Sequence, residues 1–531
     1  MKKQINLVVI ASVICLIASL LEANAQSFQP YWDAANPGSS PGGNPTWDYG
    51  PAMVAGGGTL YCIGRDRILY QWAKTNGWQY LASFRGGNGE DTLALNGNFL
   101  YVGGSFTSIS TNINIGQPVL ATNVAKLDLT SGIWSDLGRG QLANSFISDY
   151  ANDNVPMAIV ADANNNVYAC FSPFGWMCRT TNTVAFRKFD GTNWAPVGNG
   201  LVYGCSPLGM PSDTPCEACS DTGPPQFLLA TDGTNIFVGG SFSDGVNPSG
   251  LVHSPSIIKW DGTNWQPMGQ GISDPGCVHF MVWIRSIAVS GTNVFVTGNI
   301  QGEDGGFPGT CLARFSTSGT YIPTVRLLSH SIVEDQDYLR SSEFCYLAAR
   351  NGIVYVTGDF NTIESSTNYT AFDYCPDPAD SITVNGIAQW DGTTWTNLGA
   401  GLQQNDLSPA GGWAITADSN AVYVLGGFDL AGGLAATNGS FVRWVTAPDS
   451  NCPNCSPPDL IQPRISNGTF SFNISGDANT SWTVYSSTDL KNWTPVGAVT
   501  LTNGIGSFTE SNVFRELYSF YMLSNGTCCN K

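Results

Sequence analysis

Acidic side chains gather in the long segments that separate the short apolar runs of this chain. Glu303 and Asp304 are adjacent, and Glu334, Asp335 and Asp337 follow together in a later segment. Carboxylates that converge on one point could bind calcium, or could act as general acid and base on a glycosidic bond. Spacing fixes no distance between them, so solvated loop charge is the alternative interpretation. We expect no cofactor, with calcium as the ion that these groups could hold.

Aromatic residues occupy the same kind of segment. They are Trp176, Tyr203, Tyr338, Phe372 and Tyr374. Exposed rings could stack on sugars or anchor a protein partner, whereas the alternative interpretation is packing within the loops themselves. Together with the five carboxylates, these rings form the predicted ligand-binding set.

Other recognisable chemistry does not occur in the sequence. It contains no nucleophile elbow, HExxH, phosphate-binding loop or dinucleotide fingerprint. The formal net charge of −18 also makes nucleic acid a poor partner. We therefore predict no metal-ligand set of known spacing, no catalytic residue that can be named, and no nucleic-acid partner.

Cysteines are numerous for a chain with so little charge. There are 15 Cys, and setting aside Cys15 in the N-terminal apolar stretch leaves an even number, which favours disulfides in an exported protein. The expected pairs are Cys277 with Cys311, Cys345 with Cys375, Cys170 with Cys178, and Cys62 with one of Cys205, Cys216 and Cys219. Near the C-terminus, zinc is a less favoured alternative to disulfides for Cys452, Cys455, Cys528 and Cys529.

Two recurring phrases predict the elements that must position these residues. One is FLYVGGSF from Phe99 and NIFVGGSF from Asn235; the other is IIKWDGTNWQPMG from Ile257. Asp-Gly between alternating runs indicates a tight hairpin, because Gly accepts the positive φ that the turn imposes. Each repeat unit therefore contains two hairpins, or four strands.

Seven such units follow one another, beginning near Leu60, Phe99, Val167, Ile236, Val294, Val354 and Val422. A four-stranded unit cannot bury both of its faces alone, whereas seven arranged radially can form a closed β-propeller. The last unit ends at Val445 without the second phrase. We predict that residues 27–47 supply its missing strand. The expected fold is all-β, a seven-bladed β-propeller followed by a small β-sandwich.

The units resemble the kelch-like propellers of secreted bacterial proteins. The resemblance covers roughly residues 50–446, in V-Y/F-V-x-G-x-F followed by W-D-G-x-x-W-x-x-φ-G, and it implies architecture rather than activity. Galactose oxidase, a copper enzyme, shares this broad fold and needs two His with Tyr ligands. Here His253, His279 and His330 form no pair at ligand spacing, which excludes that activity.

The two ends of the chain suggest export and an accessory module. Residues 1–25 have the charged, apolar and small-residue order of a cleavable secretory signal. Residues 26–446 are assigned to the propeller, 447–464 to a Pro- and Cys-rich linker, and 465–531 to the β-sandwich. We expect a secreted, periplasmic or cell-surface monomer with no membrane span.

The C-terminal region resembles the short β-module that ends many exported proteins of Verrucomicrobia-like bacteria. The matching residues are Ser487, Thr488, Asp489, Leu490, Trp493, Phe520 and Tyr521, whereas Met522 stands where Arg is usual. In those exported proteins the module is accessory, so the resemblance implies an accessory role here.

Connection lengths suggest where binding occurs. The turns within each predicted hairpin are short, whereas the connections after the second and fourth strands are long and leave the unit on the same side. Long loops on a rigid scaffold commonly carry function. We therefore predict a non-catalytic recognition or scaffold protein that binds a polysaccharide or an envelope protein through this side. The alternative is an extracellular glycan-active hydrolase or lyase that uses loop carboxylates near the propeller axis.

Overall fold

The computed structural model describes residues 30–33, 52–64, 66–74, 76–87, 91–111, 118–137, 156–171, 183–202, 227–240, 242–272, 283–300, 310–322, 326–333, 336–341, 345–364, 381–436, 441–446, 459–466, 469–475, 481–487, 494–502, 505–511 and 520–524. Regular structure in these residues consists of β-strands, so the all-β prediction is confirmed. Two compact units divide the chain, one spanning Pro30–Val445 and the other including Thr446–Lys531.

Groups of four antiparallel strands make up most of the described part of Pro30–Val445. Group 1 contains β2 (Ala52–Gly56), β3 (Thr59–Ile63), β4 (Ile68–Ala73) and β5 (Gly77–Arg85); group 2 contains β6 (Thr92–Asn96), β7 (Phe99–Gly103), β10 (Val124–Asp128) and β11 (Ile133–Asp136); and group 3 contains β12 (Pro156–Ala161), β13 (Val167–Phe171), β14 (Thr183–Phe189) and β15 (Trp194–Pro196). Group 4 contains β17 (Phe227–Thr231), β18 (Ile236–Gly240), β21 (Ile257–Trp260) and β22 (Trp265–Pro267), and group 5 contains β23 (Trp283–Ser290), β24 (Asn293–Ile300), β25 (Thr310–Ser316) and β26 (Tyr321–Ile322). Group 6 contains β29 (Cys345–Arg350), β30 (Ile353–Gly358), β33 (Ile387–Trp390) and β34 (Trp395–Asn397), and group 7 contains β36 (Gly412–Ala417), β37 (Ala421–Gly426), β40 (Phe441–Val445) and the N-terminal strand β1 (Tyr31–Asp33).

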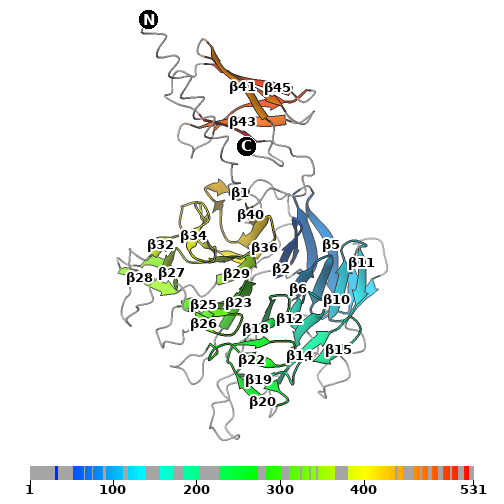
Figure 1. Ribbon diagram of the computed structural model, residues 1–531. Coiled ribbons are helices and arrows are strands. Elements are labelled where there is room, and N and C mark those ends of the chain that lie inside the picture. Colours follow the sequence, from blue (N-terminus) through cyan, green and yellow to red (C-terminus); the bar gives the residue numbers. More distant parts are fainter. Residues whose placement is uncertain are drawn as a thin grey trace. The chain divides into compact units, whose positions relative to one another are not determined.

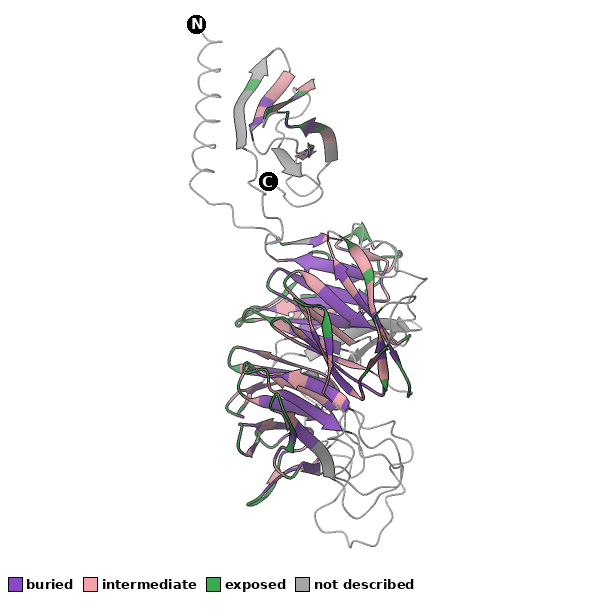
Figure 2. Ribbon diagram, turned by 90° about the vertical axis from the view of Figure 1, so that its right-hand side faces the viewer, coloured by how far each residue is buried: buried purple, intermediate pink, exposed green. Residues whose placement is uncertain are grey.

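The first strands of these groups contact one another in a cycle. The order of contact is β2, β6, β12, β17, β23, β29 and β36, and β36 returns to β2 (Figure 1). Hydrophobic clusters combine residues of successive groups, as where Leu60 and Trp72 of group 1 pack with Tyr423 and Phe441 of group 7. Figure 2 shows, in purple, that buried residues run along the strands of these groups. Because one group alone leaves an apolar face exposed, its neighbour supplies the missing cover.

The N-terminal strand pairs with the last group, as the sequence predicts. β1 runs antiparallel to β40 in the register Trp32↔Trp444. The indole Nε1 of Trp32 donates a hydrogen bond to the Leu398 carbonyl at 2.8 Å, and Trp194 in group 3 donates in the same way to Leu137 in group 2. Trp32 therefore takes the place of the Trp that the last unit lacks in its own second phrase.

The Asp-Gly turns have the geometry that the second phrase predicts. Oδ1 of Asp391 accepts hydrogen bonds from the backbone N–H groups of Thr393 and Thr394. Asp190 and Asp261 bind the equivalent N–H groups of their own turns. The following glycines have φ of 99°, 96° and 108° at Gly191, Gly262 and Gly392. Each turn is therefore an Asx turn closed by a residue without a Cβ.

These turns give acid sensitivity with a defined sign. Backbone hydrogen bonds, from Thr394 first and then Thr393, hold the pKa of Asp391 well below its usual range, and Asn193 and Thr192 do the same for Asp190. A lowered pKa in the folded state stabilises the fold above the unfolded value of about 3.9 and loses that contribution as pH falls through the folded value. We expect the Tm of the full chain to fall below about pH 4.

The matched variant is Asp190→Asn/Asp391→Asn, because Asn keeps an acceptor oxygen for the turn but cannot be titrated in this range. Its Tm should depend less steeply on pH between about 4 and 2 than that of the wild type. Calorimetric scans across this range provide the measurement. Equal slopes for the two proteins would contradict the assignment.

Within the described residues, four inserted hairpins extend the groups beyond the expected four strands. Each lies between the second and third strands of a group: β8 (Ser108–Ser110) with β9 (Val119–Leu120), β19 (Asp244–Asn247) with β20 (Gly250–His253), β31 (Thr362–Glu364) with β32 (Ser381–Thr383), and β38 (Leu430–Ala431) with β39 (Leu434–Ala435). The first strand of each hairpin pairs with a strand that ends or follows the preceding group. These partner strands are β5, β16 (Leu201–Val202), β27 (Arg326–Val333) and β35 (Leu402–Gln403). β27 also pairs with β28 (Gln336–Ser341).

The terminal Phe of the first phrase anchors these hairpins. It is buried in every group that carries one, at Phe106, Phe242, Phe360 and Phe428. Where the chain returns from the hairpin, the Asn123 N–H donates to the Phe106 carbonyl and the Ser256 N–H donates to the Phe242 carbonyl. The V-x-G-x-F phrase therefore fixes both the second strand and the base of the insertion.

The second unit contains two three-stranded antiparallel sheets. One joins β41 (Asp459–Ser466), β42 (Thr469–Ser475) and β45 (Ile505–Ser511), and the other joins β44 (Thr494–Thr500), β43 (Ser481–Ser487) and β46 (Phe520–Ser524). One hydrophobic cluster takes Phe472 and Phe508 from the first sheet and Val484 and Val499 from the second. The two sheets therefore share a core.

Three of the disulfide predictions are wrong. Cys62 in β3 and Cys170 in β13 are free thiols with no solvent exposure. Cys62 packs with Leu60 and Trp72, and Cys170 packs with Tyr168, so each points into the core rather than toward a loop. Burial raises the pKa of both thiols, which keeps them protonated and unreactive. The predicted Cys345–Cys375 disulfide is wrong as well, because Cys345 in β29 is fully buried and forms no disulfide. The other expected pairs lie outside the described side chains.

Candidate functional site

Most of the predicted ligand-binding set lies outside the described residues, namely Trp176, Tyr203, Glu303, Asp304, Glu334, Asp335, Phe372 and Tyr374. Asp337 and Tyr338 belong to β28, where their backbones pair with Ile332 and Ser331. The side chains of these two residues also lie outside the description. The set as a whole stays a prediction.

The antiparallel order of each group separates two rims. We call the rim at which first strands turn into second strands, and third into fourth, the turn rim. The opposite rim, where second strands end and first strands begin, bears the inserted hairpins, and we call it the hairpin rim. Figure 1 labels β19 and β20 as one of these hairpins.

Large apolar side chains are exposed on the hairpin rim. In Pro30–Val445 the exposed large hydrophobic residues of the described part are Leu120, Leu251, Ile382, Leu407, Trp413 and Leu434, together with Ile133 on the turn rim. Leu120, Leu251, Ile382 and Leu434 lie on the outer strands β9, β20, β32 and β39, each at the edge of its sheet. Leu251 is the most exposed of them at 66%. Exposed edge strands can pair with an added strand of a partner.

Trp413 is a candidate that sequence reasoning missed. It lies near the start of β36, a first strand, and keeps 40% of its surface exposed. Gly427 lies against its ring, since a Cβ at that position would come within 2.6 Å of Trp413 Cζ2. One feature of the sequence could have identified this residue, because the Trp that follows Gly411 and Gly412 has no counterpart in the repeated phrases.

A buried ion pair ties groups 1 and 2 together at this rim. Arg67 Nε and Nη2 each lie 3.0 Å from an oxygen of Asp91, whose side chain is 2% exposed. Arg67 also donates to the carbonyls of Gly86, Gly87 and Ser105. Burial raises the pKa of Asp91, and Arg67 opposes that rise. The pair holds the connections in place and leaves this carboxylate committed to structure.

Described side chains offer little for metal or acid–base chemistry. Within the described residues, no group of three His, Cys, Asp or Glu side chains could hold a metal ion. His253 Nδ1 lies 3.0 Å from Asp244 Oδ1, and the His side chain is 60% exposed on the β19–β20 hairpin. An exposed pair of this kind is weakly held and is not shielded from water.

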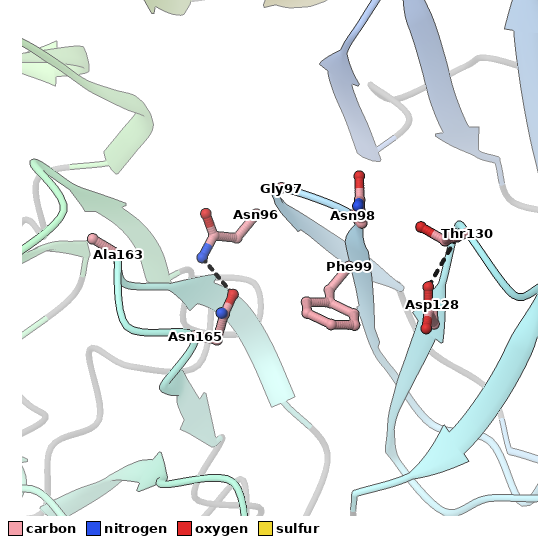
Figure 3. Close-up of a pocket in the computed structure, with 8 residues that line it drawn as sticks. All are labelled: Asn96, Gly97, Asn98, Phe99, Asp128, Thr130, Ala163 and Asn165. Carbon is pink, nitrogen blue, oxygen red and sulfur yellow. Dashed lines mark hydrogen bonds between the residues drawn. The ribbon is translucent and has the colours of Figure 1, made fainter.

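A cavity of about 450 Å³ opens on the turn rim between groups 2 and 3 (Figure 3). Its lining comes from the β6–β7, β10–β11 and β12–β13 turns: Asn96, Gly97, Asn98, Phe99, Asp128, Thr130, Ala163 and Asn165. The side chains shown in Figure 3 combine one aromatic ring with amides, a hydroxyl and a carboxylate.

Hydrogen bonds fix the polar side of this cavity. Asn96 Nδ2 donates to the Asp162 carbonyl at 2.7 Å and to Asn165 Oδ1 at 2.8 Å. Asn165 has a φ of 62°, and its N–H donates to the Asp162 carbonyl. Asp128 Oδ1 accepts from the Thr130 N–H at 2.9 Å. The amides are therefore held by two neighbouring groups.

Comparisons with known proteins report similarity in structure alone. No protein-family model matches the chain, and no curated protein matches it in sequence. The β-propeller domain of the Trilobed protease from Pyrococcus furiosus is 9% identical, with 74% of this chain and 93% of that chain covered and a TM-score of 0.35. The acylaminoacyl peptidase of Pyrococcus horikoshii is 10% identical, with 85% and 60% covered and a TM-score of 0.35. The computationally designed Ika8 protein is 12% identical, with 77% and 98% covered and a TM-score of 0.36.

Similar solved structures thus include a β-propeller domain, and TM-scores this low carry no conclusion about activity. Among the described residues, no helix has the length and apolar character needed to span a membrane.

Proposed function

We propose that this chain is a secreted, non-catalytic recognition scaffold that binds an extracellular protein or a polysaccharide through the hairpin rim. The proposal includes a kelch-like, seven-bladed β-propeller over residues 26–446, a signal peptide over residues 1–25 and a small β-sandwich after residue 465. The cyclic contacts of the first strands support the propeller, and the core shared by two sheets supports the sandwich.

The observation that carries this function is the exposure of large apolar side chains on one rim. Each of four sheet edges leaves one large aliphatic side chain in water, and a strand added to that edge would bury it. Such edges favour a protein partner that adds a strand, because backbone hydrogen bonds supply affinity and the aliphatic side chains supply contact. The exposed ring of Trp413 specifically favours a polysaccharide, so this partner class is retained as the second candidate.

A scaffold held at many points suits recognition. The Arg67–Asp91 pair and the inserted hairpins connect neighbouring groups at the hairpin rim, so the surface is formed before a partner arrives. A preformed surface loses less conformational entropy on binding than a mobile one. The alternative, a glycan-active hydrolase or lyase, depends on loop carboxylates outside the described residues.

The test combines binding with turnover. The purified full chain is applied to a polysaccharide array and to separated envelope proteins of the producing cells, and reducing-sugar release is measured in parallel. We compare the wild type with Trp413→Ala and with Leu251→Lys/Leu434→Lys, and use Ile133→Lys on the turn rim as the matched control.

Binding without sugar release, weakened at least tenfold by either hairpin-rim variant and unchanged by Ile133→Lys, is the expected result. Loss in Leu251→Lys/Leu434→Lys alone identifies a protein partner, and loss in Trp413→Ala alone identifies a polysaccharide. Release of reducing sugar would contradict the non-catalytic proposal and would support the alternative, a glycan-active hydrolase or lyase. Failure to bind either class, or equal loss in the control, would overturn the proposal.

A further inference from the structure

A second binding site, separate from the hairpin rim, lies on the opposite rim. We infer that the cavity between groups 2 and 3 binds a neutral pyranose sugar, with Phe99 as the aromatic platform and Asn96, Asn165 and Asp128 as hydrogen-bonding groups. This inference goes beyond the proposed function and does not depend on it.

Size and lining agree with a small polar ligand. A volume of about 450 Å³ lies within the range of roughly 300–1,000 Å³ that is typical of ligand pockets. The ring, amides, hydroxyl and carboxylate come from three separate turns that converge on one space (Figure 3). Most ligand pockets have a largely apolar lining with a few polar groups, whereas this lining is mostly polar and contains one aromatic ring, a composition that suits a ligand rich in hydroxyl groups.

Phe99 departs from the repeat in the way that a binding residue would. The position just before V-Y/F-V-x-G-x-F, which Phe99 occupies here, is held by Thr59, Asn166, Asn235, Asn293, Ile353 and Ala421 in the other copies. Only this copy places an aromatic ring there, and the ring is partly exposed. Lys126 Nζ lies 4.8 Å from its centroid, which holds the ring in position. The C–H face of a pyranose is apolar and can rest on the negative face of such a ring.

The amides are oriented before a ligand arrives. Asn96 uses Nδ2 for the Asp162 carbonyl and for Asn165 Oδ1, so its own side-chain oxygen is an acceptor and Asn165 Nδ2 is a donor. Figure 3 shows these two side chains meeting across the edge of the cavity. One donor and one acceptor, fixed beside each other, match the two roles that a sugar hydroxyl can take.

Asp128 selects for a neutral ligand. The backbone hydrogen bond from Thr130 is the largest cause that lowers the pKa of Asp128, so this side chain is ionised at neutral pH. Its Oδ1 serves the turn, and its second oxygen can accept from sugar hydroxyls. The same charge, in a chain of net charge −18, opposes uronic acids and other anionic sugars.

The experiment titrates the full chain with methyl β-D-glucopyranoside, methyl β-D-galactopyranoside and methyl α-D-mannopyranoside, and with glucuronate as the charged probe, monitored by saturation-transfer NMR. Variants are Phe99→Thr, which copies Thr59 at the same repeat position, and Asp128→Asn, which keeps the acceptor of the turn. Ile505→Ala, at an exposed residue of β45 in the second unit, is the control, and Trp413→Ala reports whether the hairpin rim contributes to binding. Tm values are measured for every variant.

We expect at least one neutral glycoside to bind, with its affinity reduced at least tenfold by Phe99→Thr and by Asp128→Asn and unchanged by Ile505→Ala. Glucuronate should bind more weakly than the neutral glycoside. In Asp128→Asn the difference in affinity between these two ligands should be smaller than in the wild type. The inference fails if no neutral glycoside binds, or if binding is lost in Trp413→Ala and kept in both turn-rim variants. The latter result would support the hairpin-rim function while removing this second site, so the two proposals fail separately.

Discussion

Replacing Trp32 by Ala is expected to lower the free energy of unfolding of the Pro30–Val445 unit by about 3–5 kcal/mol, the usual cost of truncating a buried aromatic side chain. Trp32 is 6% exposed, its ring centroid lies 5.2 Å from that of Trp444 with the ring planes tilted by 60°, and its indole donates to the Leu398 carbonyl. The change removes a ring from the contact between groups 6 and 7 and leaves that carbonyl without its donor. The short strand β1 is then held against β40 by its backbone pairing and by the Asp33–Arg443 ion pair.

Urea unfolding followed by the fluorescence of the buried Trp residues provides the measurement. Trp413→Ala is the matched control, because the same residue type is removed from an exposed position, and a change within about 0.5 kcal/mol is expected there. A Trp32→Ala protein as stable as this control would show that β1 contributes little to closing the last group.

Local turn chemistry explains why much of the fold could be predicted. The Asp-Gly turns at Gly191, Gly262 and Gly392 impose a positive φ that few other residues adopt, so four residues suffice to locate a hairpin. The strand supplied by residues 31–33 could be predicted because group 7 lacks a Trp that every complete phrase contains. In both cases the determining interactions are local or repeated.

The inserted hairpins escaped prediction for the opposite reason. Strands such as Val119–Leu120 and Leu434–Ala435 contain two residues each, too few for an alternating pattern. Their partners belong to the preceding group, as when β35 pairs with β38, so non-local pairing decides that they are strands at all. The disulfide predictions for Cys62 and Cys170 were wrong for a similar reason. The number of cysteines in a chain does not show whether a cysteine on a strand points into the core or toward a loop.

The candidate sites divide along the same line. The residues that the sequence analysis chose for their charge or aromatic character in long segments remain predictions. Trp413 and the cavity beside Phe99 were recognised only from their positions in the structure. Phe99 belongs to a repeat phrase and was therefore treated as a strand residue. Its partners Asp128 and Asn165 lie in other turns, and only the packing of groups 2 and 3 brings the three together.

The two rims also differ in what a substitution can disturb. Side chains of the hairpin rim, such as Leu251, are exposed and make few contacts that the fold requires, so they can vary with the partner. The same groups are held by ion pairs with little exposure, as at Arg67–Asp91 on the hairpin rim and at Arg443–Asp33 in the middle of β40. Recognition can therefore change without loss of stability only while those pairs are kept.

The Arg443–Asp33 pair gives the second large effect. Arg443 Nε and Nη2 donate to Asp33 Oδ2 at 3.0 and 2.8 Å, and the Arg443 side chain is 2% exposed. Removing the carboxylate in Asp33→Ala leaves a guanidinium in the core without its counter-ion, and truncation of one member of a buried pair typically costs about 3–5 kcal/mol. We expect a loss of that size in urea unfolding of the full chain.

A double-mutant cycle separates the pair from simple packing. In Asp33→Ala/Arg443→Met the charge is removed together with its counter-ion, and Met retains the contact that Arg443 makes 5.3 Å from the centre of the Trp72 ring. Buried pairs replaced by apolar residues are often neutral, so the double variant should be more stable than Asp33→Ala alone. Because Arg443 is so little exposed, 0.5 M salt should leave the cost of Asp33→Ala nearly unchanged. Additive effects of the two substitutions would mean that β1 is held by Trp32 and backbone pairing, with no net contribution from the charges.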